Sequence, residues 1–93
     1  MKTYESMIIV KPNLSEEAAK KENEKIQAFI KENGGEVLKV DEWGKRKLAY
    51  EIQKFTEGYY FVINYTFEPS QISQLERYYK LNEEVIRYNI LAK

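Results

Sequence analysis

The chain has 93 residues, 43% of them hydrophobic and 32% charged, which is typical of a single folded domain over residues 1–93 rather than of a disordered chain. It contains no cysteine and no histidine, which excludes disulfides, thiolate metal sites and the commonest general base. Its 15 basic and 15 acidic residues cancel, which counts against a freestanding nucleic-acid binder. No apolar run approaches the ~20 residues of a membrane span, and no signal peptide is recognisable, so we expect a cytoplasmic protein.

The first third of the chain predicts a strand followed by a helix. The strand is expected over residues 3–10, with alternate side chains on one face: Tyr4, Ser6, Ile8 and Val10. Asn13 or Ser15 is expected to cap the helix, because either side chain can accept a hydrogen bond from a free amide of the first turn. The Asn33-Gly34-Gly35 segment is expected to end it, since glycine readily takes the left-handed closing conformation.

The middle of the chain predicts a hairpin of two strands. The first strand is expected from Glu36 to Ile52, with a break or bulge near Gly44. Alternation then becomes regular, and three residues are expected to support the fold: Leu48, Tyr50 and Ile52. A turn is predicted over residues 54–58. The second strand, residues 59–67, would place five large side chains on one face: Tyr59, Phe61, Ile63, Tyr65 and Phe67.

The last third predicts a second helix and a fourth strand. Pro69 and Ser70 are expected to open the helix, which frays near Leu81. Its apolar stripe would consist of Ile72, Leu75 and Tyr79. The strand is expected from residue 85 onward. One of its faces would carry Ile86, Tyr88, Ile90 and Ala92, and the other Arg87, Asn89, Leu91 and Lys93.

The predicted elements follow one another in the order βαββαβ, in which each helix connects two strands. Right-handed crossovers then place both helices on the same side of one sheet. The expected fold class is α+β, a ferredoxin-like two-layer sandwich with a four-stranded, mainly antiparallel sheet and two helices on one face. The other face of the sheet would be uncovered.

No motif for catalysis, cofactor binding or metal binding is recognisable, and the isolated glycines form no phosphate-binding loop. Neighbouring acids such as Glu16 and Glu17 suit the positive end of a helix better than a catalytic pair. Most tyrosines are expected in the core: Tyr4, Tyr59, Tyr65, Tyr79 and Tyr88. Tyr60 would instead lie on the open face, where aromatic residues of some ferredoxin-like sheets stack on RNA bases. We therefore expect no enzyme activity, no cofactor and no bound metal.

A basic cluster, Lys45-Arg46-Lys47, lies beside the expected bulge at Gly44. In one interpretation these charges protect a solvated edge strand against edge-to-edge aggregation. In the other they bind phosphate, since arginine can hold a phosphate with two parallel hydrogen bonds. Arg87 and Lys93 on the open face would support the second interpretation, and Lys2 could join them.

The segment DEWGKRKLAYEIQKFTEGYY closely resembles the signature of the family of the sixth protein of the bacterial small ribosomal subunit. The family's characteristic residues recur at the same spacing, as Gly44, Lys45, Arg46, Leu48, Ala49, Tyr50, Ile52 and Lys54. The segments MKTYE and LNEEVIRYNIL are also similar to the family, so the resemblance covers essentially the whole chain. It departs at Glu51, where many members have proline, and at Lys93, beyond which many members carry a polar tail.

The resemblance implies a ferredoxin-like, non-catalytic protein of the cytoplasmic ribosome. Family members bind the central domain of small-subunit ribosomal RNA as a heterodimer with the eighteenth protein of the subunit, and a basic partner would explain the neutral charge. The implied RNA contacts are Lys2, Arg46, Arg87 and Lys93, followed by Lys45, Lys47 and Lys54. Tyr50 and Tyr60 are candidates for stacking or partner contact. The alternative is a ferredoxin-like module that binds a small ligand or forms a homodimer, which would need a pocket with convergent polar groups.

Overall fold

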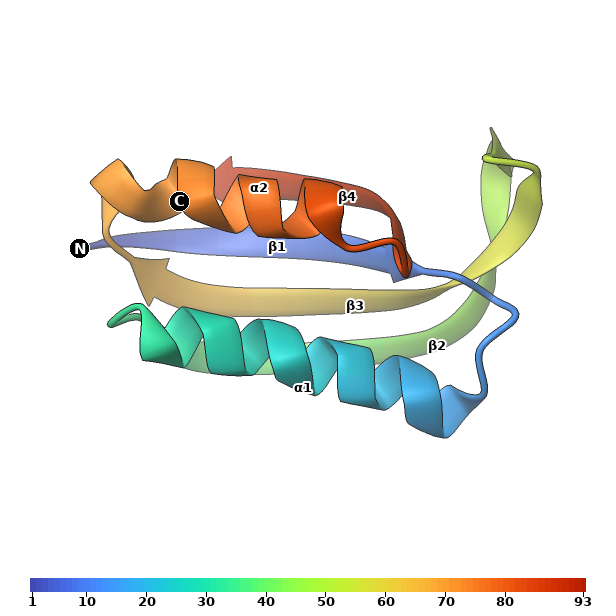
Figure 1. The fold of residues 1–93 in the computed structure, drawn as a ribbon, viewed down its shortest axis with the longest axis horizontal. Coiled ribbons are helices and arrows are strands. Elements are labelled where there is room, and N and C mark those ends of the chain that lie inside the picture. The colour runs from blue at the N-terminus through green and yellow to red at the C-terminus, as the bar shows by residue number, and fades with distance from the viewer.

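The structure, a computed structural model, describes residues 1–93 and shows a four-stranded sheet with both helices on one face (Figure 1). The elements are β1 (Lys2–Val10), α1 (Glu16–Glu32), β2 (Glu36–Ile52), β3 (Phe55–Phe67), a 3₁₀ turn (Pro69–Gln71), α2 (Ile72–Leu81) and β4 (Val85–Ala92). The strand order is β2-β3-β1-β4, and every neighbouring pair is antiparallel. The predicted ferredoxin-like βαββαβ fold is confirmed.

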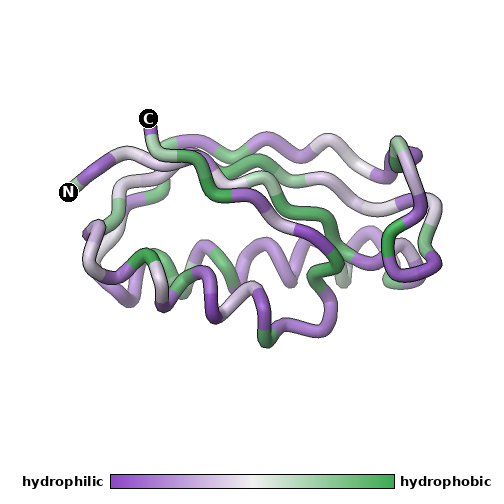
Figure 2. The backbone as a smooth tube through the Cα atoms, turned by 90° about the horizontal axis from the view of Figure 1, so that it is seen from above, coloured by the Kyte–Doolittle hydropathy of each residue, from purple (hydrophilic) through white to green (hydrophobic).

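The hydrophobic core lies between the sheet and the two helices. Figure 2, which views the molecule at right angles to Figure 1, shows these two layers and the uncovered face of the sheet. The five residues predicted on one face of β3 are all buried in the core. Ile26 and Ile30 of α1 and Leu75 of α2 cover them. Of the five tyrosines predicted in the core, four are buried and Tyr88 packs half-buried against the same cluster.

Three hydroxyl groups are hydrogen-bonded to one another inside this core. The Ser6 Oγ lies 2.8 Å from the Tyr65 hydroxyl, and the Tyr79 hydroxyl donates to the same Oγ at 3.1 Å. A buried hydroxyl without a partner would cost free energy, so the three groups satisfy one another. Burial raises the pKa of Tyr65 to about 12 and also raises the pKa of Tyr79 above its ordinary value.

Both ends of α1 follow from local sequence. Ser15, rather than Asn13, is the cap, because its Oγ accepts a hydrogen bond from the Ala18 amide at 3.1 Å. At the other end Gly34 has a φ of +86°, and the amides of residues 33–35 bond to carbonyls of the last turn. The predicted end of the helix at the Asn33-Gly34-Gly35 segment is confirmed.

The turn predicted over residues 54–58 is wrong for most of its length. Ile52 pairs with Phe55 across a two-residue turn, Gln53–Lys54, in which both residues have positive φ. Gly58 lies inside β3, where a Cβ atom would come within 2.4 Å of Ile9 Cγ2. The glycine that suggested a turn is therefore required by the close approach of two strands.

The face predicted for Ile86 is also wrong. The pairing of β1 with β4 shifts register, so that Ile9 pairs with Arg87 but Val10 pairs with Val85. Val85 consequently joins the core, whereas Ile86 is buried outside the core cluster, near Gly58. An irregularity of one residue reverses the face of the side chains that precede it.

Candidate nucleic-acid interface

The predicted basic cluster lies in the outer end of the β2–β3 hairpin, which we call the arm (residues 45–57). Figure 1 shows these paired ends bending out of line with the rest of the sheet, beyond the end of β1. At the base of the arm Gly44 has a φ of +76° and the register shifts, which confirms the predicted bulge. Because β2 is an edge strand, the cluster lies on an edge of the sheet.

The side chains of the cluster point in different directions. Lys45 pairs with the core residue Tyr59, and its ammonium group lies 5.3 Å from the centroid of that ring. Arg46 donates a hydrogen bond from Nε to the Trp43 carbonyl at 3.0 Å, which leaves its terminal nitrogens without a partner in the chain. Lys54 occupies the turn at the tip. The arm thus presents cations on both of its faces and at its end.

β2 is irregular within the arm. From Lys47 to Ile52 it advances five residues while β3, its partner, advances only two. The three residues predicted to alternate line one hollow together, but Tyr50 does not support the fold as predicted, because it is 59% exposed. Leu48 and Ile52 are half-buried.

The two basic residues of the last strand differ in their surroundings. Arg87 contacts the arm: its Nη1 donates to the Tyr50 hydroxyl, and its guanidinium lies 5.4 Å from the centroid of that ring. Lys93 lies past the other end of β4, where its ammonium is held by Asn64 Oδ1 at 2.7 Å and by the Glu5 carboxylate at 3.4 Å. Arg87 therefore belongs with the arm, and Lys93 does not.

Lys2 lies with Lys93 near the two termini, at the end of the sheet away from the arm (Figure 1). The two segments are joined by a hydrogen bond from the Lys93 amide to the Thr3 carbonyl at 2.9 Å. The structure thus divides the seven basic residues singled out from the sequence. It gathers Lys45, Arg46, Lys47, Lys54 and Arg87, and it places the other two at the far end of the molecule.

None of the five gathered cations pairs with a carboxylate. The ion pairs of the structure involve other lysines: Lys20, Lys25, Lys39, Lys80 and Lys93. The arm contains four basic residues against only Glu51 and Glu57, so with Arg87 its net charge is +3 in a chain whose net charge is zero. Unpaired cations concentrated in this way suit a ligand with many phosphates.

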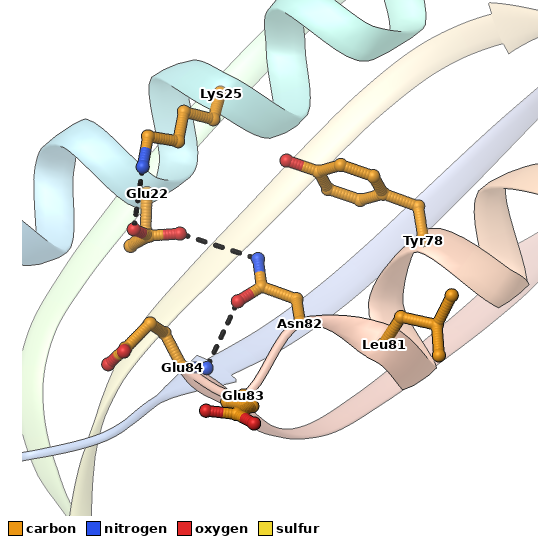
Figure 3. Close-up of a pocket in the computed structure, with 7 residues that line it drawn as sticks. All are labelled: Glu22, Lys25, Tyr78, Leu81, Asn82, Glu83 and Glu84. Atoms are coloured by element: carbon orange, nitrogen blue, oxygen red, sulfur yellow. Dashed lines mark hydrogen bonds and ion pairs between the residues drawn. The ribbon is translucent and has the colours of Figure 1, made fainter.

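The largest cleft lies elsewhere, between α1 and the end of α2, and has a volume of about 480 Å³ (Figure 3). Three carboxylates line it, from Glu22, Glu83 and Glu84, with Lys25 as the only base. Glu22 is held by Lys25 at 3.2 Å and by Asn82 Nδ2 at 3.3 Å. An anionic ligand would be repelled there, so this cleft is not the candidate site.

The uncovered face of the sheet also carries a cleft, of about 280 Å³, whose charged lining residues are Glu5 and Asp41. Trp43 forms part of its wall and is 47% exposed. Its ring stacks on Tyr60 at a centroid separation of 6.0 Å. Tyr60 lies on the open face as predicted. Sequence reasoning assigned no role to Trp43, although a tryptophan beside a bulge glycine was a usable signal.

No helix of this structure combines the length and the apolar character needed to cross a bilayer. No three side chains of the metal-binding types lie together in a group that could hold a metal ion.

The structure therefore defines a ferredoxin-like α+β domain whose β2–β3 hairpin ends in a cationic arm, and the cations of this arm form no ion pair with a carboxylate. A sequence model of the family described as Ribosomal protein S6 matches residues 3–92. A relative named small ribosomal subunit protein bS6, from Heliobacterium modesticaldum, is 43% identical over 100% of this chain and 97% of its own length. The protein of the same name from Dictyoglomus turgidum is 51% identical over 97% of this chain and 93% of its own.

Structural comparison agrees. The crystal structure of 30S ribosomal protein S6 from Thermotoga maritima matches with a TM-score of 0.94 and 38% identity, covering 99% of this chain and 87% of that one. The chain therefore belongs to the ribosomal protein S6 family. The resemblance noted in the sequence is confirmed, and membership makes this a protein of the small subunit of the cytoplasmic ribosome, in a family of structural proteins rather than enzymes.

Proposed function

We propose that this chain is a structural constituent that binds the central domain of small-subunit ribosomal RNA together with the eighteenth small-subunit protein, and that it catalyses no reaction. Family membership supports the general assignment. The proposal rests mainly on one observation: the four basic side chains of the arm and the neighbouring Arg87 have no carboxylate partner. Contacts of this kind fix the position of a protein on RNA.

The arginines are the strongest candidates for phosphate contact. Arg46 uses Nε for its bond within the chain, and its terminal nitrogens remain free to hold a phosphate with two hydrogen bonds. Arg87 uses one terminal nitrogen on Tyr50 and keeps further donors. Three lysines of the arm would add charge without fixed geometry: Lys45, Lys47 and Lys54.

Lys2 and Lys93 would contact a second stretch of RNA at the other end of the sheet. Lys93 would first have to exchange Glu5 and Asn64 for phosphate. This second contact is accordingly weaker in our proposal. Tyr50 and Tyr60 would contribute by stacking or by contact with the partner protein.

The neutral charge of the chain explains why a partner is needed. A domain with one cationic arm neutralises few phosphates, and a basic partner would supply the remainder. The proposal is tested by pull-down of small-subunit ribosomal RNA at increasing salt, with and without the eighteenth small-subunit protein. We expect recovery to fall with salt and to rise with the partner. Recovery that responded to neither would refute the proposal and favour the small-ligand or homodimeric alternative.

A variant of Arg46 tests the arm directly. Arg46→Ala should weaken RNA binding at every salt concentration and reduce the slope of log K against log salt by about 1. The matched control is Arg77→Ala, which removes an exposed, unpaired arginine from α2 on the other layer. Both variants should melt at the temperature of the parent protein. A large fall in melting temperature for Arg46→Ala alone would make Arg46 a structural residue.

A further inference from the structure

A small pocket of about 170 Å³ lies where the arm meets the open face of the sheet. Ile9 of β1 and Leu48 and Ile52 of the arm contribute apolar walls, and Tyr50 and Arg87 form part of its rim. Leu48, Tyr50 and Ile52 reach the pocket by alternation along β2, and Ala49 lines it as well because the pairing of β2 with β3 is irregular between Lys47 and Ile52.

The lining of this pocket differs from that of the other two clefts. Its only charged residue is Arg87, whereas the other clefts each contain at least two carboxylates. Two tyrosines line it, and the exposed ring of Tyr50 is already covered on one side by the guanidinium of Arg87. Flat aromatic and guanidinium surfaces beside an apolar hollow are the surfaces on which proteins stack unpaired bases.

The charge around the pocket decides between a nucleotide and an apolar side chain of a protein partner. The arm with Arg87 has a net charge of +3, and none of its cations is neutralised by a carboxylate. A purely apolar side chain would leave these cations without a partner. A nucleotide brings a phosphate together with a planar base, so it complements both the rim and the hollow.

We propose that this pocket receives the base of one unpaired nucleotide of the bound RNA, stacked against Tyr50, while Arg87 holds the adjacent phosphate. The inference rests on the proposed RNA binding and adds to it a preference for RNA with an extruded base. Arg87 then holds the phosphate and, through its contact with the ring of Tyr50, supports the surface on which the base stacks. Arg46 and the lysines of the arm contact the flanking backbone.

The test compares three RNAs that share one stem sequence. The first stem carries a single bulged adenosine, the second carries an abasic residue at that position, and the third is fully paired. The only tryptophan, Trp43, stacks on Tyr60 of the pocket, so its fluorescence reports binding close to the site. We expect the bulged stem to bind about five- to 150-fold tighter than the abasic stem, which retains the phosphate but has no base to stack.

Two variants separate the pocket from general RNA binding. Tyr50→Leu should abolish the preference for the bulged stem over the abasic stem, because it removes the ring on which the base stacks. Arg46→Ala should weaken all three RNAs by the same factor, because it removes only a backbone contact. Circular dichroism and melting temperature should show that both variants remain folded, as expected for exposed residues.

The results of these experiments distinguish the nucleotide pocket, the proposed RNA binding and a pocket for the protein partner. Equal affinity for the bulged and abasic stems would overturn the nucleotide pocket and leave the proposed RNA binding intact. Failure of all three RNAs to bind would overturn the nucleotide pocket, and failure to recover small-subunit ribosomal RNA in the presence of the protein partner would overturn the proposed RNA binding as well. If Tyr50→Leu weakened binding of the eighteenth small-subunit protein and left the preference for the bulge intact, the pocket would belong to the protein partner and our assignment would be wrong.

Discussion

Replacing Gly58 by alanine should destabilise the protein through one identifiable contact. The added Cβ would lie 2.4 Å from Ile9 Cγ2 and 3.3 Å from the Val10 carbonyl oxygen. Ile9 is 4% exposed and its Cγ2 branches close to the backbone, so it cannot swing into solvent. The strands β1 and β3 would have to separate at the base of the arm, where Val10 pairs with Tyr59.

The expected cost follows from the size of the overlap. Forcing one extra carbon into a closely packed site typically costs about 1–3 kcal/mol. For a domain of this size, that loss corresponds to a fall in melting temperature of roughly 5–20 °C. No conformational penalty is added, because Gly58 does not have a positive φ.

A double-mutant cycle with Ile9→Ala isolates the contact. Ile9→Ala alone should cost about 2–5 kcal/mol, because it removes a buried side chain. It also removes Cγ2, so adding Gly58→Ala to it should cost clearly less than adding Gly58→Ala to the parent. Urea denaturation followed by circular dichroism measures the four free energies of unfolding. Equal costs of Gly58→Ala in the two backgrounds, or a cost below about 0.5 kcal/mol in the parent, would refute the explanation.

Two further predictions concern stability elsewhere in the fold. In the unfolded chain tyrosine ionises near pH 10, whereas burial raises the pKa of Tyr65 to about 12, so the native state binds more protons in this interval. The contribution of Tyr65 to the free energy of unfolding should therefore be constant up to about pH 9 and diminish above it, by up to about 1.4 kcal/mol per pH unit; a urea midpoint unchanged between pH 9 and pH 11.5 would contradict this. Ser15→Ala should cost about 0.5–2 kcal/mol by removing the cap of α1, while Asn13→Ala should have little effect. Thermal melts of both variants check this, and equal losses would mean that the cap does not act through its side chain.

Much of the fold was predictable because local and periodic signals agreed along the chain. The alternation of β3 placed Tyr65 and Phe67 in the core, and capping by Ser15 and closure at Gly34 bounded α1. The element order then required the ferredoxin-like topology, since right-handed crossovers leave few alternatives. The errors arose where tertiary contacts decide: Tyr50 lies on the arm beyond the core, Gly58 serves a close approach of strands, and a register shift moves Ile86 off the core face.

The candidate site was only partly predictable. The residue types of the basic cluster and the family signature identified the relevant segment, but they could not distinguish Arg87, which contacts the arm, from Lys93, which is neutralised by Glu5. In the sequence pattern both residues fall on the same predicted face, although β4 ends at Ala92 and Lys93 follows it. Which of them has a carboxylate neighbour depends on the adjacent strand, and pattern along one strand carries no information about it.

The amino-acid sequence by itself determined the order of elements, the composition of the core and the family, because each depends on short-range periodicity or on a contiguous motif. Only the tertiary structure decided that Gly58 serves a close approach of strands rather than a turn, and that the arm bends to form a pocket beside Arg87. The close approach depends on the pairing of β1 with β3, and the pocket depends on a register shift between β2 and β3. A shift of register is a property of two segments together, so neither segment shows it alone.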